Sequence, residues 1–454
     1  MAGGQVTTAR TASRFDPLWL VAASGGQHSG VLTVRGWTVV LLDAVGTVTD
    51  ADALDDLGTM CGWREDPAPE GAPPFVGGAV GYLTEDAGGP WLALPPDPRP
   101  VRAGLSAVHF AVHDTAVCLP PDDGPAWLVA ADLPGWSRRS AEDRLARLVR
   151  LVDDAADAPP VEAPPIDPPA WFRRSLDERA HRAGVERALE WIGDGDLYQL
   201  NLTLQIGVSW PHGGVALARR LWDASPAAGH QAYLSTADAE VVSISPETFL
   251  AVDGDRAAVC PIKGTRPRSV DEHADAAAAL ALEGSEKDRA EHVMIVDLER
   301  NDLGKVCEAG SVIVPRLAEL EAHPTVWHLT STVEGRLRGD TGLRDLLSAL
   351  FPCGSVTGAP KRMAVARTRA LEPARRGVYC GAIGVVSRGI VDLSVGIRTA
   401  VLRGGVATYG TGGGIVADSD PADEYAEAMD KAAAFLRATG AAQTGESAAV
   451  AQAR

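Results

Sequence analysis

A series of short apolar runs separated by glycine and proline constrains the fold of this chain more than any other feature. Between residues 15 and 151 these runs read PLWLVAAS, WTVVLLDA, FVGGAVGYL, SAVHFAVHD and AWLVAAD. Apolar runs this short, bounded by turn residues, are typical of β-strands. We therefore expect an N-terminal strand-rich region of antiparallel strands over residues 15–154, preceded by a disordered N-terminus at residues 1–14.

A proline-rich segment then interrupts the pattern. The stretch DAPPVEAPPIDPPA contains three Pro-Pro pairs, which exclude both a helix and a central strand. The stretch just before it, SAEDRLARLVRLVDDAADA, has the apolar spacing of an amphipathic helix. We interpret residues 155–170 as a semi-rigid connection, either a true domain linker or a long loop within one fold. A second region follows over residues 171–440, and residues 441–454 are expected to form a disordered tail.

The second region mixes helices with strands. Its helical stretches are SLDERAHRAGVERALEWIGDGD, EKDRAEHVMIVDLERNDLGKV and DPADEYAEAMDKAAAFLRATG. In the last of these, Asp420 is the expected N-cap and Gly440 the expected stop. Strands are expected at DLYQLNLTLQIGVSW, GAIGVVS and GVATYGTGGGIV, and EVVSISPETFLAVDGDRAAVCPIKGT is interpreted as two strands joined by a DGD turn.

The charge and cysteine content narrow the function classes. A net charge of -18 disfavours nucleic acid and anionic membranes as partners. The six cysteines lie far apart without a C-x-x-C pair, so no zinc or redox motif is present, and free thiols in a reducing cytosol are expected. No stretch reaches the roughly 20 apolar residues of a membrane span. A cytoplasmic location is therefore expected.

Two helices carry carboxylates three residues apart, Asp288 with Glu291 and Glu424 with Glu427. This spacing places each pair on one helix face. Such a face is either simply solvated or, if the two helices face each other, a source of oxygen ligands for Mg²⁺. Lys431 falls along the same stripe as the second pair.

Two glycine-rich loops, CGSVTGAPKR and YGTGGGIVADSD, match neither the P-loop nor the dinucleotide pattern. They are either tight turns or backbone cradles for an anion. A similar ambiguity surrounds Lys263 in AVCPIKGTRPRS, which is either a solvated surface lysine or a chemically used amine.

A set of motifs occurring in one order resolves part of this ambiguity. They read GDLYQLNLT, SPETFL, PIKGTRPR, KDRAEHVMIVDLERNDLG, HLTSTVEG, FPCGSVTGAPKRMA, RRGVYCGAIG, GIRTA and TGGGIVADSDPADEYAEAMDKA. Over residues 172–438 the chain resembles the chorismate-utilising enzymes, and FVGGAVGYLTED extends the resemblance weakly into the N-terminal region. The resemblance implies an α+β fold in which two large, mostly antiparallel sheets pack face to face with helices outside. Residues 171–440 would then be the chorismate-binding catalytic region.

The resemblance also implies roles for individual residues. Glu291 and Glu427 would hold Mg²⁺ against the ring carboxylate of chorismate, supported by Asp288 and Glu424. Glu247 would be the general acid that protonates the departing 4-hydroxyl group. The remaining implied site residues are His328 and Gln199 near the reacting ring, and Tyr379, Arg398, Gly412, Gly414, Thr357, Lys431, Gly264 and Thr265 as substrate contacts.

Two positions bear on which reaction is catalysed. Gln199 stands where isochorismate and salicylate synthases carry a basic lysine, so water activation is disfavoured. Lys263 in PIKGT resembles the aminodeoxychorismate synthase component I branch, whereas anthranilate synthases typically read PIAGT. The implied role of Lys263 is nucleophilic: it adds at C2 of chorismate, and ammonia then displaces it by attacking C4. Such an amine must be unprotonated, so its pKa must be lowered.

The expected function is therefore C4 amination of chorismate on the route to 4-aminobenzoate. Anthranilate synthases have a tryptophan-sensing pocket whose signature is an LLES or RYSF stretch near the N-terminus, and no convincing match to it is found here. The amidotransferase signature, a cysteine in a G-x-C-x-G elbow, is also absent from this sequence. Ammonia is therefore expected from a separate glutamine amidotransferase subunit. The alternatives are anthranilate synthase component I, a non-catalytic regulatory or scaffold subunit, and a nucleotide-driven enzyme. The sequence departs from the family pattern at Cys353, usually Gly, and at Glu299, usually apolar.

Overall fold

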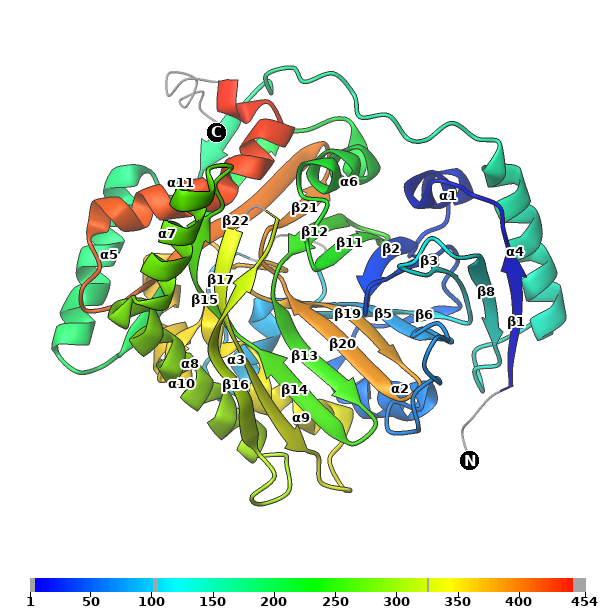
Figure 1. The fold of residues 1–454 in the computed structure, drawn as a ribbon, viewed down its shortest axis with the longest axis horizontal. Helices are drawn as coiled ribbons and strands as arrows, with labels where there is room; N and C mark the ends of the chain where they lie inside the picture. The colour runs from blue at the N-terminus through cyan, green and yellow to red at the C-terminus, as the bar shows by residue number, and fades with distance from the viewer. Residues whose placement is uncertain (1–4, 101–104, 325, 444–454) are drawn as a thin grey trace.

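The computed structural model describes residues 5–100, 105–324 and 326–443. Two large β-sheets form its centre, and helices cover their outer faces (Figure 1). Every strand pairing within these sheets is antiparallel. The expected α+β sandwich is thereby confirmed.

The first sheet has 12 strands and includes β9 (Phe172–Arg174), which pairs with β10. The order of its other strands is β1 (Val6–Thr11), β8 (Ala126–Ala131), β7 (Thr115–Leu119), β3 (Trp37–Leu41), β2 (Gly30–Val34), β11 (His230–Ser235), β12 (Glu240–Ser245), β21 (Thr399–Arg403), β22 (Val406–Ile415), β10 (Gln199–Ser209) and β18 (Gly358–Ala359).

The second sheet has 10 strands and includes β16 (Ile313–Ala322), which pairs with β17. The order of its other strands is β15 (Ile262–Pro267), β17 (Val326–Arg336), β14 (Arg256–Cys260), β13 (Thr248–Asp253), β20 (Ile390–Val395), β19 (Ala382–Ser387), β5 (Gly78–Leu83), β6 (Val108–His113) and β4 (Gly46–Val48).

Alternation along the strands builds the layers. On β3, Val39 and Leu41 join a core that also contains Val80 of β5 and Val385 of β19, so this core lies between the two sheets. Val40, between them in sequence, points the other way, into the core under the helices. Because successive side chains of a strand point to opposite faces, a strand buried on both faces is apolar throughout.

The helices cover the two outer faces. The first sheet packs against α1 (Pro17–Ser24), α4 (Ala141–Ala156), α6 (Gly213–Ala224) and α11 (Pro421–Ala438). The second sheet packs against α2 (Leu54–Cys61), α8 (Glu286–Gly304) and α9 (Leu343–Leu350). The other helices are α3 (Gly88–Trp91), α5 (Glu178–Gly193), α7 (Glu272–Glu283) and α10 (Lys361–Leu371). Among the described residues, no helix combines the length and apolar character that a membrane crossing requires.

Most of the expected elements are confirmed, and the Asp420 side chain caps α11 as expected. The run PLWLVAAS, expected as a strand, is helix α1 instead. The carboxylate of Asp16 accepts the Leu18 N–H at its N-terminus, Pro17 occupies its first turn, and Gly25 ends it in a left-handed conformation. These local capping interactions decide the structure of a run whose periodicity is ambiguous.

Three further expectations need correction. Residues 6–11, within the expected disordered N-terminus, form β1 and pair with β8. The stretch interpreted as two strands around a DGD turn contains four, β12 to β15, because Pro246 and Pro261 separate them. At the other end, residues 441–443 form a 3₁₀ turn, and the rest of the expected tail lies outside the described residues.

The proline-rich segment is a long loop within one fold. Residues 157–170 form neither helix nor strand. Strands from both sides of this segment share both sheets: β2 pairs with β11 in the first, and β5 pairs with β19 in the second. The N-terminal and C-terminal regions therefore do not form separate sheets.

Candidate active site

The amine of Lys263 lies where β15 of the second sheet meets β10 and β22 of the first. A Cβ atom added at Gly414 on β22 would lie 2.9 Å from Lys263 Nζ and 2.7 Å from Gln199 Nε2. Only a residue without a side chain lets both polar groups approach the strand this closely. Gly414, Gln199 and Lys263, predicted from separate motifs, thus meet at one point.

Lys263 is partly buried, and its amine lies against Gly414 of β22. Burial lowers its pKa, and the positive charge of Lys431 lowers it further, while Glu291, Glu427 and Glu247 act in the opposite direction. The net shift is downward. A larger share of this amine is therefore unprotonated near neutral pH than of an ordinary lysine.

Glu247 follows β12 and is 4% exposed. Burial raises the pKa of this carboxyl to about 7, against smaller lowering effects from Ser355 and Lys263. Within the described chain, Glu247 Oε1 and both side-chain polar atoms of Gln199 are buried without a hydrogen-bond partner. Unsatisfied buried polar groups are costly, so a cluster of them at one site is typical of a place that receives a polar ligand.

The acidic residues expected to hold a metal come from α8 and α11. Glu424 and Glu427 lie beside Gly413, and Lys431 Nζ contacts Glu427 Oε1 at 2.6 Å. Asp288 forms an ion pair with Arg266 at 2.9 Å, a partner that the sequence did not predict. Among the residues that the structure describes, no three metal-binding side chains form a ready-made cluster.

The donor chemistry nevertheless fits one kind of metal site. Burial raises the pKa of Glu291, and the negative charges of Asp288 and Glu427 raise it further. Carboxylates that repel one another in this way are stabilised by a cation between them. Mg²⁺ commonly takes one or two protein carboxylates and completes its shell with water and oxygens of an anionic substrate.

Other predicted substrate contacts surround this point. His328 on β17 is paired with Thr265 on β15, and its Nδ1 lies 3.0 Å from Thr265 Oγ1 and 3.4 Å from the Gly264 carbonyl oxygen. Burial lowers the pKa of His328 to about 4, and the charge of Arg398 contributes. The imidazole is therefore neutral near pH 7. Arg398 has a φ of 51°, a conformation uncommon for a residue with a side chain.

Of the last predicted contacts, Tyr379, Thr357 and Gly412 are buried, and Lys431 is partly buried. Tyr379 packs directly on Gly410 of β22, where an added Cβ would lie 2.1 Å from its Cγ. The Thr357 hydroxyl donates to the Cys353 carbonyl at 2.9 Å, so its proton is already used by the backbone. Lys431 donates to the Gly412 carbonyl at 3.0 Å. The Gly412 carbonyl oxygen is therefore already hydrogen-bonded to Lys431.

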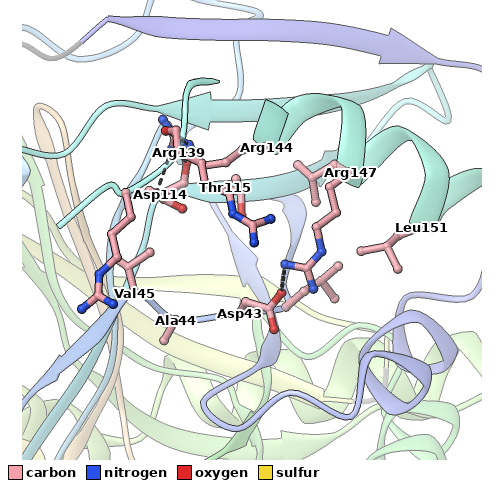
Figure 2. Close-up of a pocket in the computed structure, with 12 residues that line it drawn as sticks. Asp43, Ala44, Val45, Asp114, Thr115, Arg139, Arg144, Arg147 and Leu151 are labelled. Carbon is pink, nitrogen blue, oxygen red and sulfur yellow. Dashed lines mark hydrogen bonds and ion pairs between the residues drawn. The ribbon is translucent and has the colours of Figure 1, made fainter. Parts of the chain in front are cut away.

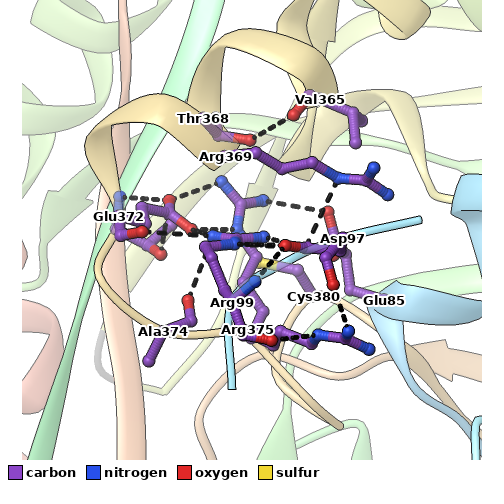
Figure 3. A network of polar contacts seen from close by, with 12 residues as sticks. Glu85, Asp97, Arg99, Val365, Thr368, Arg369, Glu372, Ala374, Arg375 and Cys380 are labelled. Atoms are coloured by element: carbon purple, nitrogen blue, oxygen red, sulfur yellow. Dashed lines mark hydrogen bonds and ion pairs between the residues drawn. The ribbon is translucent and has the colours of Figure 1, made fainter. Parts of the chain in front are cut away.

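The sequence reasoning missed a buried ion network behind the site (Figure 3). Arg376 is paired with Glu372 at 2.8 Å, and it donates to the backbone carbonyls of Val356 at 2.9 Å and Asn201 at 2.6 Å. Val356 directly precedes Thr357 in sequence, and Asn201 follows Gln199 by two residues. The four-residue spacing between Glu372 and Arg376 was a sequence feature that could have indicated this ion pair.

Glu299 and Cys353, noted as departures from the family pattern, contact each other. The Gly354 N–H donates to Glu299 Oε1 at 2.8 Å, and Cys353 Sγ donates to the same oxygen at 3.6 Å. Both residues are buried. The two departures therefore form one structural feature.

Two surface cavities lie elsewhere. One, of about 310 Å³, lies beside α4 (Figure 2), where Arg147 pairs with Asp43 and Arg144 with Asp114. The other, of about 590 Å³, lies beside β9 and includes Trp171. Neither is lined by any of the predicted site residues, and the arginines named here are already paired with carboxylates.

Comparison with known proteins agrees with this geometry. An aminodeoxychorismate synthase from Streptomyces pristinaespiralis is 41% identical over 76% of this chain, which spans only 49% of that relative's length. Aminodeoxychorismate synthase component 1 from Bacillus subtilis is 32% identical over 94% of this chain and 92% of the relative. The structure of anthranilate synthase component I from Streptococcus pneumoniae TIGR4 superimposes with a TM-score of 0.77 at 28% identity, covering 88% of this chain and 92% of that one. A family model described as chorismate binding enzyme matches residues 44–437, and the chain belongs to this family of chorismate-utilising enzymes.

Proposed function

We propose that this protein aminates chorismate at C4 and releases 4-amino-4-deoxychorismate, as an aminodeoxychorismate synthase component I in 4-aminobenzoate biosynthesis. The observation that carries the proposal is the partly buried amine of Lys263, which has a lowered pKa and lies beside Gly414, within electrostatic reach of a protonatable Glu247. A nucleophile and an acid with oppositely shifted pKa values suit one displacement reaction.

The chemistry proceeds in two displacements. The neutral amine of Lys263 adds to C2 as the double bonds of the ring shift and the C4–O bond breaks. Glu247 donates its proton to the departing oxygen, which leaves as water. Ammonia then attacks C4, the double bonds shift back and the C2–N bond to Lys263 breaks. The surplus proton of the incoming ammonia returns to Glu247.

The remaining residues position the substrate. Arg398 and Tyr379 would contact the enolpyruvyl carboxylate, and neutral His328 would face the ring. Glu291 and Glu427 would hold Mg²⁺, which when bound supplies positive charge beside the ring carboxylate. Gln199 can donate and accept hydrogen bonds but cannot take a proton from water at neutral pH, which supports amination over hydration.

The test compares two substitutions of Lys263 in the presence of chorismate, Mg²⁺ and ammonium, with products identified by mass spectrometry. Lys263→Ala should lose several orders of magnitude in rate, because a covalent step is removed. Lys263→Arg should lose as much, because a guanidinium stays protonated. Lys305→Ala is the control, because Lys305 is half-exposed and pairs with Asp302. Near-normal C4 amination by the arginine variant, without a lysine adduct in the unmodified protein, would exclude the nucleophilic role.

A second candidate function is that of anthranilate synthase component I. The support is that the Streptococcus pneumoniae structure that superimposes on this chain is itself an anthranilate synthase component I. The same incubation separates the two reactions, because only anthranilate synthase releases pyruvate and a fluorescent aromatic acid in one step.

We further propose that a glutamine amidotransferase supplies the ammonia. The support is that the Bacillus subtilis relative is named component 1 of its synthase. The purified chain should then use ammonium better at alkaline pH, where more free ammonia is present, and should not use glutamine. Glutamine-dependent product from this chain alone would contradict the proposal.

A further inference from the structure

One of the expected metal ligands, Glu427, is paired with a cation of the chain itself. Lys431 Nζ lies 2.6 Å from Glu427 Oε1 and donates a second hydrogen bond to the Gly412 carbonyl at 3.0 Å. Both side chains come from α11, four residues apart, so they lie on one face of the helix. An ammonium group has three N–H donors, and these two contacts use two of them.

This ion pair lies over Gly413, where α11 packs along β22 (Figure 1). A Cβ atom added at Gly413 would lie 2.9 Å from Glu424 Oε2, 3.8 Å from Glu427 Oε1 and 3.9 Å from Lys431 Nζ. The Ser419 hydroxyl donates to the other oxygen of Glu424 at 2.5 Å. Two carboxylates and one ammonium group therefore converge on a single point of the strand.

The charges around Glu427 show how closely the lysine and the carboxylate are linked. Burial opposes ionisation of Glu427, but the charges of Lys431, Lys263 and Lys287 together hold its pKa below the ordinary value. Of these three lysines, Lys431 has the largest effect. A divalent cation on the same carboxylate oxygen would bring two positive charges next to this ammonium group, and like charges at such a short distance repel. The ammonium group and a metal ion therefore exclude each other from Glu427 Oε1.

We propose that Lys431 competes with Mg²⁺ for Glu427, and that the ring carboxylate of chorismate ends this competition by taking the ammonium group. The lysine side chain is long and flexible, so the ammonium group can turn from Glu427 to a nearby anion while it keeps its hydrogen bond to Gly412. Glu427 is then available to the metal. Metal and substrate therefore bind cooperatively, and the metal alone binds weakly. This inference rests on the proposed function, in which Glu427 is a metal ligand and chorismate the substrate.

The test measures metal binding without turnover. Mn²⁺ is the probe, because it accepts the same oxygen ligands as Mg²⁺ and its paramagnetic resonance signal separates free from bound ion. The protein is titrated with Mn²⁺ alone, and then with Mn²⁺ and chorismate in the absence of ammonium. Lys431→Met should bind Mn²⁺ alone at least about fivefold more tightly than wild type. Chorismate should tighten Mn²⁺ binding at least about fivefold in wild type, and by a smaller factor in Lys431→Met.

Lys287→Met is the matched control for the loss of one positive charge. Lys287 is exposed on α8, and its charge affects the pKa of Glu427 less than that of Lys431 does. This variant should tighten the binding of Mn²⁺ alone by less than about twofold, as expected for an exposed charge that acts through solvent. Equal tightening in the two variants would indicate a general charge effect and overturn the inference.

A third variant separates this inference from the proposed function. Glu427→Gln should weaken Mn²⁺ binding both in wild type and in Lys431→Met. If it does, and Lys431→Met still binds Mn²⁺ as wild type does, the competition is excluded while the metal ligand stands. If Glu427→Gln leaves binding unchanged, both the ligand and the competition are wrong. If the expected binding pattern is found in a protein that does not aminate chorismate at C4, the inference holds and the proposed reaction fails.

Discussion

A methyl group added at Gly414 should block the chemistry while leaving the fold intact. The added carbon would lie 2.9 Å from Lys263 Nζ and 2.7 Å from Gln199 Nε2. Ordinary nonbonded contacts begin near 3.5 Å, so each polar group must retreat by roughly 0.6–0.8 Å. Both atoms lie at the ends of flexible side chains, which can move without disturbing the backbone.

The expected cost falls on catalysis. A misplacement approaching 1 Å in a reacting group typically lowers the rate by about 100-fold. The free energy of unfolding should change by less than about 1 kcal/mol, because replacement of glycine in an unstrained strand reduces the entropy of the unfolded chain.

The assay measures C4 amination of chorismate with ammonium, together with urea unfolding. Gly207→Ala on β10 is the matched control, since its added Cβ would meet Trp171 at an ordinary 3.5 Å. Full activity of Gly414→Ala, or an equal loss in Gly207→Ala, would refute the assignment of this glycine to the site.

Three other substitutions test the electrostatics. Folding raises the pKa of Glu247 from 4.5 to about 7, so part of the stability that the wild type has at low pH is lost as pH rises through this range. Glu247→Gln should therefore gain stability relative to wild type between pH 5 and 8, by up to about 3 kcal/mol in urea unfolding. Parallel curves of stability against pH for the two proteins would contradict this. Glu372→Ala should cost about 3–5 kcal/mol, since it leaves Arg376 buried without its carboxylate, and a urea midpoint close to wild type would exclude a structural role for the network. Glu291→Gln should weaken chorismate-dependent Mg²⁺ binding by at least about tenfold in calorimetry, and unchanged binding would remove Glu291 from the proposed ligand set.

The sequence predicted the elements better than their arrangement. Helices such as α4 and α11 carry their own caps and apolar stripes, so local residues determine them. Helix α1 was missed because its apolar residues show no periodicity and its caps, Asp16 and Gly25, lie just outside the run. The pairing of β5 with β19 depends on contacts between residues far apart in sequence, and it was not predicted. The family resemblance implied only the two large sheets.

The site shows the same division. Ordered motifs identified Lys263, Gln199 and Gly414, and the structure brings them together. The pairing of Asp288 with Arg266, and the contacts of Glu299 with Cys353 and Gly354, were not predicted. These contacts depend on the relative placement of α8, β15 and the loop at residue 353, which no local pattern specifies.

Both sheets contain strands from before and after the proline-rich loop, and this has a consequence for synthesis on the ribosome. β2 has β3 on one side and β11 on the other, and β5 has β6 on one side and β19 on the other. When the nascent chain reaches the proline-rich loop, β11 and β19 have not been made, so β2 and β5 each expose an open edge. Open edges are templates for aggregation. The N-terminal region therefore depends on prompt completion of the chain or on a chaperone, and expressed alone it should aggregate.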